Sequence, residues 1–125
     1  MDFKKLLAYQ KSFELAMLIF EISKSFPKEE TYSLTDQIRR SSRSVCANIS
    51  EAYRKRRYPK HFISKLTDAD GENSETNTWL EFALACNYID KEKHLKLTQL
   101  GVEIGKLINY MINNPSKFGV NTGNE

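Results

Sequence analysis

The stretch 34–57, LTDQIRRSSRSVCANISEAYRKRR, combines an apolar seam at helical spacing with an arginine-rich face. The seam positions lie mostly three or four residues apart: Leu34, Ile38, Ser42, Val45, Ile49, Ala52 and Tyr53. At about 100° per residue, the arginines on the opposite side are Arg39, Arg40, Arg43, Arg54 and Arg57. Such a helix packs its seam against other elements and turns its polar side outward. The stretch therefore predicts a helix with helical neighbours and an outward face of arginines.

Three further segments share this periodicity. We expect helices from about Phe3 to Ser25, from Pro59 to about Tyr88, and from about Lys91 to Ile112. Residues 70–77, DGENSETN, are poor helix formers, but the apolar period continues across them. Four helices with short connections predict an all-α protein, an antiparallel up-down-up-down four-helix bundle over residues 1–112. Residues 113–125 are expected to form a flexible C-terminal tail.

Composition indicates one small domain. The chain has 125 residues, of which 40% are hydrophobic and 28% charged. Cys46 and Cys86 show neither a CxxC motif nor metal-ligand spacing, so we expect free thiols, no metal and no cofactor. No signal-peptide pattern and no apolar run of membrane-spanning length occur, which favours a cytoplasmic protein with no membrane partner.

Two features concern packing between helices. Gly101 and Gly105 lie one turn apart in the last helix, which predicts a close approach of a neighbouring helix. Residues 15–22, LAMLIFEI, and 79–89, WLEFALACNYI, are apolar on nearly every side. A helix that is apolar all round must be buried all round. Self-association is the simplest way to cover the second face of each segment.

Charge is unevenly distributed along the chain. Residues 36–65 contain nine basic and two acidic side chains (+7), whereas residues 66–92 contain one basic and seven acidic ones (−6). The two helices could attract each other, or the basic one could bind phosphates. Tyr53 and Tyr58 flank the basic cluster and could stack on unpaired bases, although Tyr53 also fits the seam. The candidate nucleic-acid-binding residues are Arg39, Arg40, Arg43, Arg54, Lys55, Arg56, Arg57 and Lys60.

The same region resembles a known family. Arg40-Ser41, Ser44-Val45 and the run 48–52, NISEA, are similar to the pattern R-A-x-x-S-I-x-x-N-I-A-E-G. That pattern belongs to four-helix-bundle proteins encoded in intervening sequences of bacterial large-subunit (23S) rRNA genes. Ala69-x-Gly71 with Glu75-Thr76 resembles the A-x-G-S-x-x-E-T element of the family's third helix, and the opening F-x-x-L-x-x-Y-Q-x-S is similar too.

The resemblance implies a ring, most simply a homopentamer, without known enzymatic activity. It also implies kinship with accessory proteins of diversity-generating retroelements, whose basic rings are thought to engage RNA and a reverse transcriptase. Function in most of the family is unassigned. Two positions depart from the pattern: Ala52 replaces the usual Gly, which favours continuation of the helix into residues 54–57, and Glu72 replaces the usual Ser.

Few residues suggest chemistry. Asn48 and Glu75 are expected inside the bundle, where hydrogen-bonded polar groups would fix helix register, with each other or Ser41, Ser44 and Thr76 as partners. Neither histidine follows a glutamate by three residues, so the Glu-x-x-His ligands of a di-iron bundle are missing. A third possibility is a small enzyme with its site between subunits, and a deep pocket that gathers Glu72, Glu75 and His61 would support it.

The sequence thus predicts a non-catalytic homo-oligomeric binding or scaffold protein that contacts RNA or a nucleic-acid enzyme through its basic second helix. The alternative is a structural or protein-interaction oligomer without nucleic-acid binding. In it, Asp68, Glu72 and Glu75 of a neighbouring subunit would cover Arg39, Arg43 and Arg54.

Overall fold

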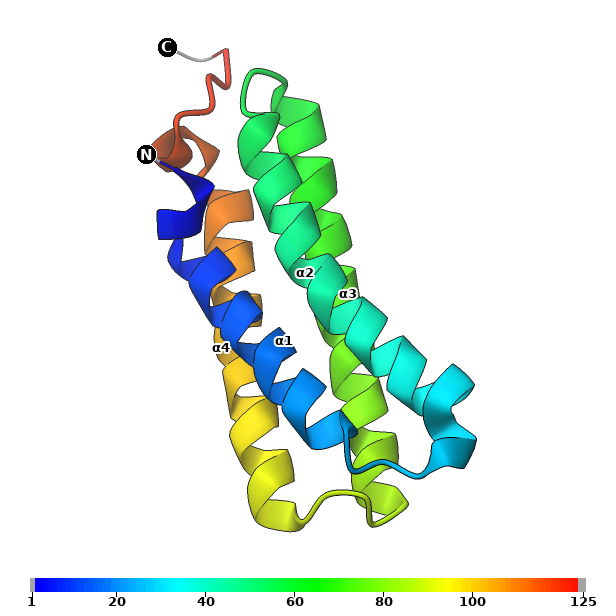
Figure 1. Ribbon diagram of the computed structural model, residues 1–125. Coiled ribbons are helices and arrows are strands. Elements are labelled where there is room, and N and C mark those ends of the chain that lie inside the picture. Colours follow the sequence, from blue (N-terminus) through cyan, green and yellow to red (C-terminus); the bar gives the residue numbers. More distant parts are fainter. Residues whose placement is uncertain (1, 124–125) are drawn as a thin grey trace.

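The computed structural model describes residues 2–123, which form a four-helix bundle without strands (Figure 1). The helices are α1 (Leu7–Ser23), α2 (Asp36–Arg54), α3 (Pro59–Ala85) and α4 (Lys91–Asn113). Each helix packs against its neighbour in sequence, and α4 closes the bundle onto α1. Successive helices run in opposite directions along one long axis. The prediction of an all-α, antiparallel up-down-up-down four-helix bundle is confirmed.

Shorter turns connect or flank these helices. They are η1 (Phe3–Lys5), η2 (Lys28–Glu30), the π-helical turn η3 (Thr31–Thr35) and η4 (Pro115–Phe118). The predicted first helix is interrupted at Leu6, whose extended backbone separates η1 from α1. Among the described residues, no helix is both long and apolar enough to cross a membrane.

The apolar seam that predicts α2 is buried along its whole length. Ile38, Ile49 and Ala52 have no exposed surface, and the other four seam residues are less than one-tenth exposed. Full burial of an aliphatic side chain contributes about 1.5–3 kcal/mol, so this seam is a main source of the bundle's stability. It packs chiefly against α3 and α1.

The weakly helical stretch 70–77 is helical throughout, and two of its polar side chains, Asn73 and Thr76, face the interior and are hydrogen-bonded there. Asn73 Nδ2 donates to the Gly101 carbonyl of α4 at 2.9 Å, and Thr76 Oγ1 lies 2.8 Å from Ser41 Oγ of α2. A Cβ added at Gly101 would lie 2.7 Å from Asn77 Oδ1. The predicted close approach is therefore present at Gly101.

The helix α2 ends at Arg54, so its predicted continuation through Arg57 is wrong. The residue before a proline is driven to extended backbone, and Tyr58 (φ −119°, ψ 91°) precedes Pro59. The chain leaves the helix at Lys55 (φ −98°, ψ 22°), and the Tyr58 amide donates to the Lys55 carbonyl at 2.9 Å. Residues 55–58 consequently form a turn between α2 and α3.

The C-terminal segment is not the unstructured tail predicted from its composition. After α4, η4 leads to Val120, whose side chain is buried among core residues. Arg56 Nη1 donates to the Phe118 carbonyl at 3.3 Å, which ties this segment to the α2–α3 turn. Because this segment is held by contacts with residues far away in sequence, its local composition does not predict that it packs on the bundle. Residues 124 and 125 lie outside the described part of the chain.

Candidate nucleic-acid interface

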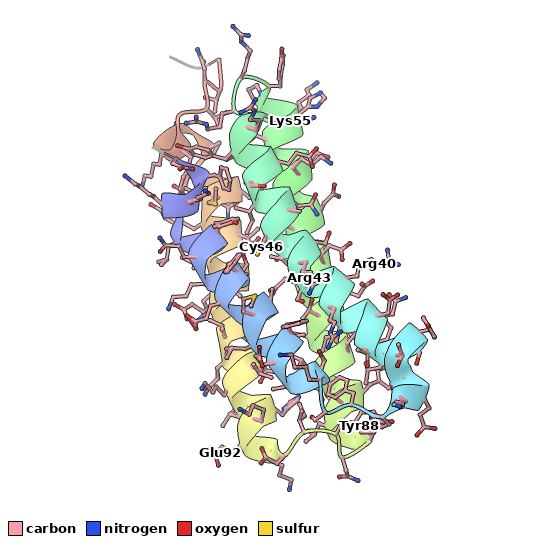
Figure 2. The ribbon with its side chains drawn as sticks, in the orientation of Figure 1. Arg40, Arg43, Cys46, Lys55, Tyr88 and Glu92 are labelled. Atoms are coloured by element: carbon pink, nitrogen blue, oxygen red, sulfur yellow. The ribbon has the colours of Figure 1, made fainter. Side chains whose placement is uncertain are left out.

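The predicted basic residues divide into two groups. The mid-helix group consists of Arg39, Arg40 and Arg43, and the turn group consists of Arg54, Lys55, Arg56, Arg57 and Lys60. About 16 Å of helix separates Arg43 from Arg54, at 1.5 Å per residue. Figure 2 shows Arg40 and Arg43 along α2, and Lys55 at the end of the bundle where α2 meets α3. The structure therefore replaces the single predicted face with two basic surfaces.

The mid-helix group is partly engaged by α1. Arg39 Nε donates to Ser23 Oγ at 2.7 Å, and its guanidinium lies 4.9 Å from the centre of the Phe20 ring. The guanidinium of Arg43 lies 5.6 Å from the same ring. Cation–π contacts of this kind contribute about 0.5–1 kcal/mol at exposed sites. They hold the two guanidinium groups against Phe20 of α1.

Arg40 lies toward the acidic helix α3. Burial, together with the neighbouring Glu75 carboxylate, raises the pKa of Glu72, and the positive charge of Arg40 partly opposes that rise. The two groups therefore influence each other electrostatically, although no ion pair within 4.0 Å joins them in the described chain.

One member of the turn group is committed to the fold. Arg56 Nε donates to the Tyr53 carbonyl at 2.8 Å, and its guanidinium lies 3.7 Å from the centre of the Tyr53 ring. Because it also donates to the Phe118 carbonyl, Arg56 joins the α2–α3 turn to the C-terminal segment. Tyr53 is only 7% exposed and covered by Arg56, so its suggested role as a base-stacking platform is wrong.

The remaining members of the turn group have no acidic partner among residues 2–123. Arg54, Arg57 and Lys60 are exposed and Lys55 is half-buried. One ion pair does join α2 to α3, between Glu51 of α2 and Lys65 of α3 at 3.2 Å. Its acid lies on the basic helix α2, so the pair does not come from the arginines. Within residues 2–123, these arginines therefore form no ion pair between the basic α2 and the acidic α3.

The two polar residues expected inside the bundle have different outcomes. Asn48 is half-buried and donates from Nδ2 to the Ser44 carbonyl at 2.9 Å and to Ser44 Oγ at 3.1 Å. This confirms a partner for Asn48, but a bond within one helix does not fix register between helices. Glu75 is exposed, so its predicted interior position is wrong.

The interior positions near Glu75 belong to Asn73 and Thr76, both buried. A rotation of about 100° per residue separates neighbouring positions on a helix, so Glu75 points outward when Thr76 points inward. Asn73 bonds α3 to α4, and Thr76 bonds α3 to α2. The sequence predicts Thr76 as a hydrogen-bond partner, but it gives no sign of Asn73, because the two fall among polar residues whose inward or outward direction depends on packing.

The residues proposed for an intersubunit enzyme are not gathered within the chain. His61 lies in the first turn of α3, about 16 Å along the helix axis from Glu72. Both His61 and Glu75 are exposed. No cluster of three or more His, Cys, Asp or Glu side chains that could hold a metal ion occurs within residues 2–123. Cys46 is buried and Cys86 is exposed, and both are free thiols.

The geometry defines a class: a small antiparallel helical bundle with an exposed basic turn at one end. Within that class, the chain belongs to the family of 23S rRNA-intervening sequence proteins, whose family model matches residues 4–110. The resemblance drawn from α2 and α3 is thereby confirmed, whereas kinship with retroelement accessory proteins stays a prediction.

A solved structure agrees with this assignment. The chain is similar to a protein of unknown function from the S23 ribosomal protein family of Bacteroides thetaiotaomicron, with 33% sequence identity and a TM-score of 0.78. The match covers 86% of this chain and 96% of that one. No curated protein matches the chain.

Proposed function

We propose that this protein is a non-catalytic, homo-oligomeric scaffold that binds RNA or another nucleic acid through its basic turn. The observation that carries the proposal is the projection of Arg54, Lys55, Arg57 and Lys60 from one end of the bundle without a carboxylate partner in residues 2–123. Arginine binds phosphate in a bidentate manner, and each neutralised phosphate releases condensed counterions. Several such groups close together on a folded turn favour a polyanion over a single phosphate.

Exposed apolar side chains on two different faces support self-association. Phe13 and Met17 of α1 are 50% and 47% exposed, and Phe82 of α3 is 53% exposed beside Trp79. When two unlike surfaces meet head to tail, the assembly closes into a ring if the rotation allows it. The family resemblance implies a pentamer, in which every subunit would repeat the turn group around one axis. Repetition would convert weak individual contacts into avidity.

A salt series tests nucleic-acid binding. Binding of the nuclease-treated protein to a structured RNA should weaken steeply as salt rises. The variant with Arg54, Lys55, Arg57 and Lys60 changed to Ala should bind more weakly, and its log–log salt slope should flatten by about one for each lost phosphate contact. Arg56 is left intact because it holds the C-terminal segment.

The matched control removes exposed positive charge from the opposite end of the bundle. Lys91, Lys93 and Lys96 lie in the first turns of α4, and their change to Ala should leave the slope unchanged. Equal binding and equal slopes for the turn variant and the wild type would contradict the proposal. So would the absence of binding at low salt.

The alternative function is a structural oligomer in which arginines pair with acids of neighbouring subunits. It is favoured by the mid-helix group and by the acids Asp68, Glu72 and Glu75 on α3, where Glu75 and Asp68 both contribute to the raised pKa of Glu72. Under this alternative, Arg43→Glu should reduce the oligomer mass in analytical ultracentrifugation, and adding Glu75→Arg should restore it. In the nucleic-acid proposal, the same substitution leaves the mass unchanged.

A nucleic-acid enzyme such as a reverse transcriptase is the further partner that the resemblance implies.

A further inference from the structure

An exposed aromatic pair lies where the basic turn meets α3, with Tyr58 at the end of the turn and His61 in the first turn of the helix. The Tyr58 side chain is 56% exposed, and its ring centre lies 5.8 Å from that of His61, which is also exposed. The two ring planes are inclined by 58°, so they do not cover each other face to face. Arg57 precedes the pair and Lys60 lies within it along the chain. Aromatic surface and positive charge are thus presented together.

The backbone under this pair is fixed although the rings are solvent-facing. The Tyr58 amide donates to the Lys55 carbonyl at 2.9 Å, and the Tyr58 carbonyl accepts from the Phe62 amide at 3.0 Å. Pro59 fixes its own φ and restricts Tyr58 before it to extended backbone, and the fully buried Phe62 anchors the first turn of α3 in the core. The aromatic pair therefore stands on a rigid base, which lowers the entropy cost of binding a ligand.

Three other tyrosines are placed differently. Tyr110 of α4 is 47% exposed, but its ring packs edge to face against Phe118, and its hydroxyl accepts a hydrogen bond from Lys117 at 3.0 Å. Tyr53 is buried beneath Arg56. Tyr32 is 93% exposed, but its surroundings along the chain are the acids Glu29, Glu30 and Asp36. Tyr58 is the exposed tyrosine that the basic turn surrounds.

Paired and unpaired nucleotides differ in what they offer to such a surface. A continuous RNA duplex keeps its bases stacked inside, so a protruding side chain reaches mainly phosphates and sugars. An unpaired nucleotide exposes a base face that an aromatic ring can cover, while basic neighbours bind the flanking phosphates. Residues 57–61 offer both kinds of contact within five residues.

We propose that the Tyr58–His61 pair stacks on an unpaired base while Arg57 and Lys60 bind the adjoining phosphates. The preferred ligand is consequently a single-stranded segment or loop of nucleic acid rather than a continuous duplex. This inference rests on the proposed nucleic-acid binding and names the ligand class for the same surface.

The test compares ligands that carry equal numbers of phosphates. They are an unstructured single-stranded RNA, its single-stranded DNA equivalent, a blunt RNA duplex, and an RNA hairpin with 2-aminopurine in the loop. Wild-type protein should prefer the single strands and the hairpin to the duplex. Because stacking is worth a factor of about 5 to 150 per base, changing Tyr58 and His61 to Ala should weaken single-strand binding by about fivefold or more and leave duplex binding nearly unchanged. The RNA and DNA arms identify which sugar the surface accepts.

Two single variants separate stacking from a general effect of mutation. Tyr58→Phe keeps the ring and should retain both affinity and the quenching of 2-aminopurine fluorescence. Tyr32→Ala removes a more exposed tyrosine outside the basic turn and should have no effect.

The outcomes distinguish the two proposals. Steeply salt-dependent binding with no preference for unpaired ligands, and no loss in the double variant, would overturn the stacking inference and leave phosphate binding intact. Absence of binding to all four ligands would overturn both. Loss of affinity for single strands and duplex alike would also contradict stacking, because it would indicate an effect on the turn as a whole.

Discussion

The glycines of α4 provide a sharp test of how α3 and α4 pack, because the same substitution should have opposite effects one turn apart. In a helix interior, alanine is favoured over glycine by about 0.8–1 kcal/mol. At Gly105, an added Cβ would lie 3.5 Å from Asn73 Nδ2 and 4.0 Å from Asp70 Oδ1, which are ordinary contacts. Gly105→Ala should therefore raise the free energy of unfolding by about 0.5–1 kcal/mol.

At Gly101 the added methyl group meets an obstacle. Its Cβ would lie 2.7 Å from Asn77 Oδ1 and 3.4 Å from both Cγ and Nδ2 of the same amide. Flipping the amide only exchanges oxygen for nitrogen, so the Asn77 side chain or the helix must move. Overpacking of this kind costs about 1–3 kcal/mol. After subtraction of the propensity gain, Gly101→Ala should lower the free energy of unfolding by about 1 kcal/mol.

Urea unfolding at one fixed protein concentration measures both effects, since self-association would make stability depend on concentration. The two variants should differ by about 2 kcal/mol. Asn77→Ala should restore stability to Gly101→Ala, giving a coupling of about 1–2 kcal/mol in a double-mutant cycle. The reasoning is refuted if Gly101→Ala is as stable as Gly105→Ala, or if Asn77→Ala gives no rescue.

Three other predictions follow from contacts away from this interface. Arg56→Ala should destabilise the protein by about 1 kcal/mol, because the hydrogen bond between the turn and the C-terminal segment is lost. Hydrogen exchange in the C-terminal segment should increase, and unchanged exchange would contradict the contact. The hydrogen bond from Tyr88 to Glu30 raises the pKa of Tyr88 to about 12, and hydrogen bonds from Ser33 and Tyr88 lower that of Glu30. Stability from this pair should be full between the two unfolded-state pKa values, and should decline as pH rises through about 12 or falls through the lowered pKa of Glu30. In unfolding measured against pH, Tyr88→Phe should remove the alkaline limb and reduce the acid limb, which the hydrogen bond from Ser33 partly sustains. Unchanged limbs would exclude the pair as their cause. Burial raises the pKa of the Cys46 thiol, so a thiol-reactive disulfide reagent should modify the exposed Cys86 rapidly and Cys46 slowly; removal of the fast phase by Cys86→Ala checks the assignment.

Helix location was predictable because the signal is repeated along each segment. The apolar period of α2 is present at every turn, and all of its seam residues are buried. Pro59 marks the start of α3, and the predicted Lys91 start of α4 is the observed one. Even the polar middle of α3 follows the period, because Ala69, Asn73, Thr76 and Leu80 occupy successive interior positions.

The candidate site was predictable in composition but not in arrangement. The sequence identifies all eight basic residues, yet it places Arg56 and Arg57 on a helix that ends earlier. Arg56 is engaged in the fold because it donates to the carbonyl of Phe118, which lies 62 residues further along the chain. The aromatic partner of Tyr58 depends on how the turn orients the first residues of α3. Both contacts depend on how segments are placed in three dimensions, either far apart in the sequence or on two sides of a turn. The sequence does not give these distances.

The sequence alone determined the helical class, the order and approximate length of the four helices, and the excess of positive charge on α2. These properties depend on local periodicity, on proline and on composition, which any short stretch carries by itself. Tertiary structure decided that Asn73 rather than Glu75 faces the interior, that Arg56 holds the C-terminal segment, and that Tyr58 rather than Tyr53 remains exposed. The physical reason is that burial and hydrogen bonding depend on which segments meet, and a shift of about 100° between neighbouring helix positions is enough to exchange core for surface.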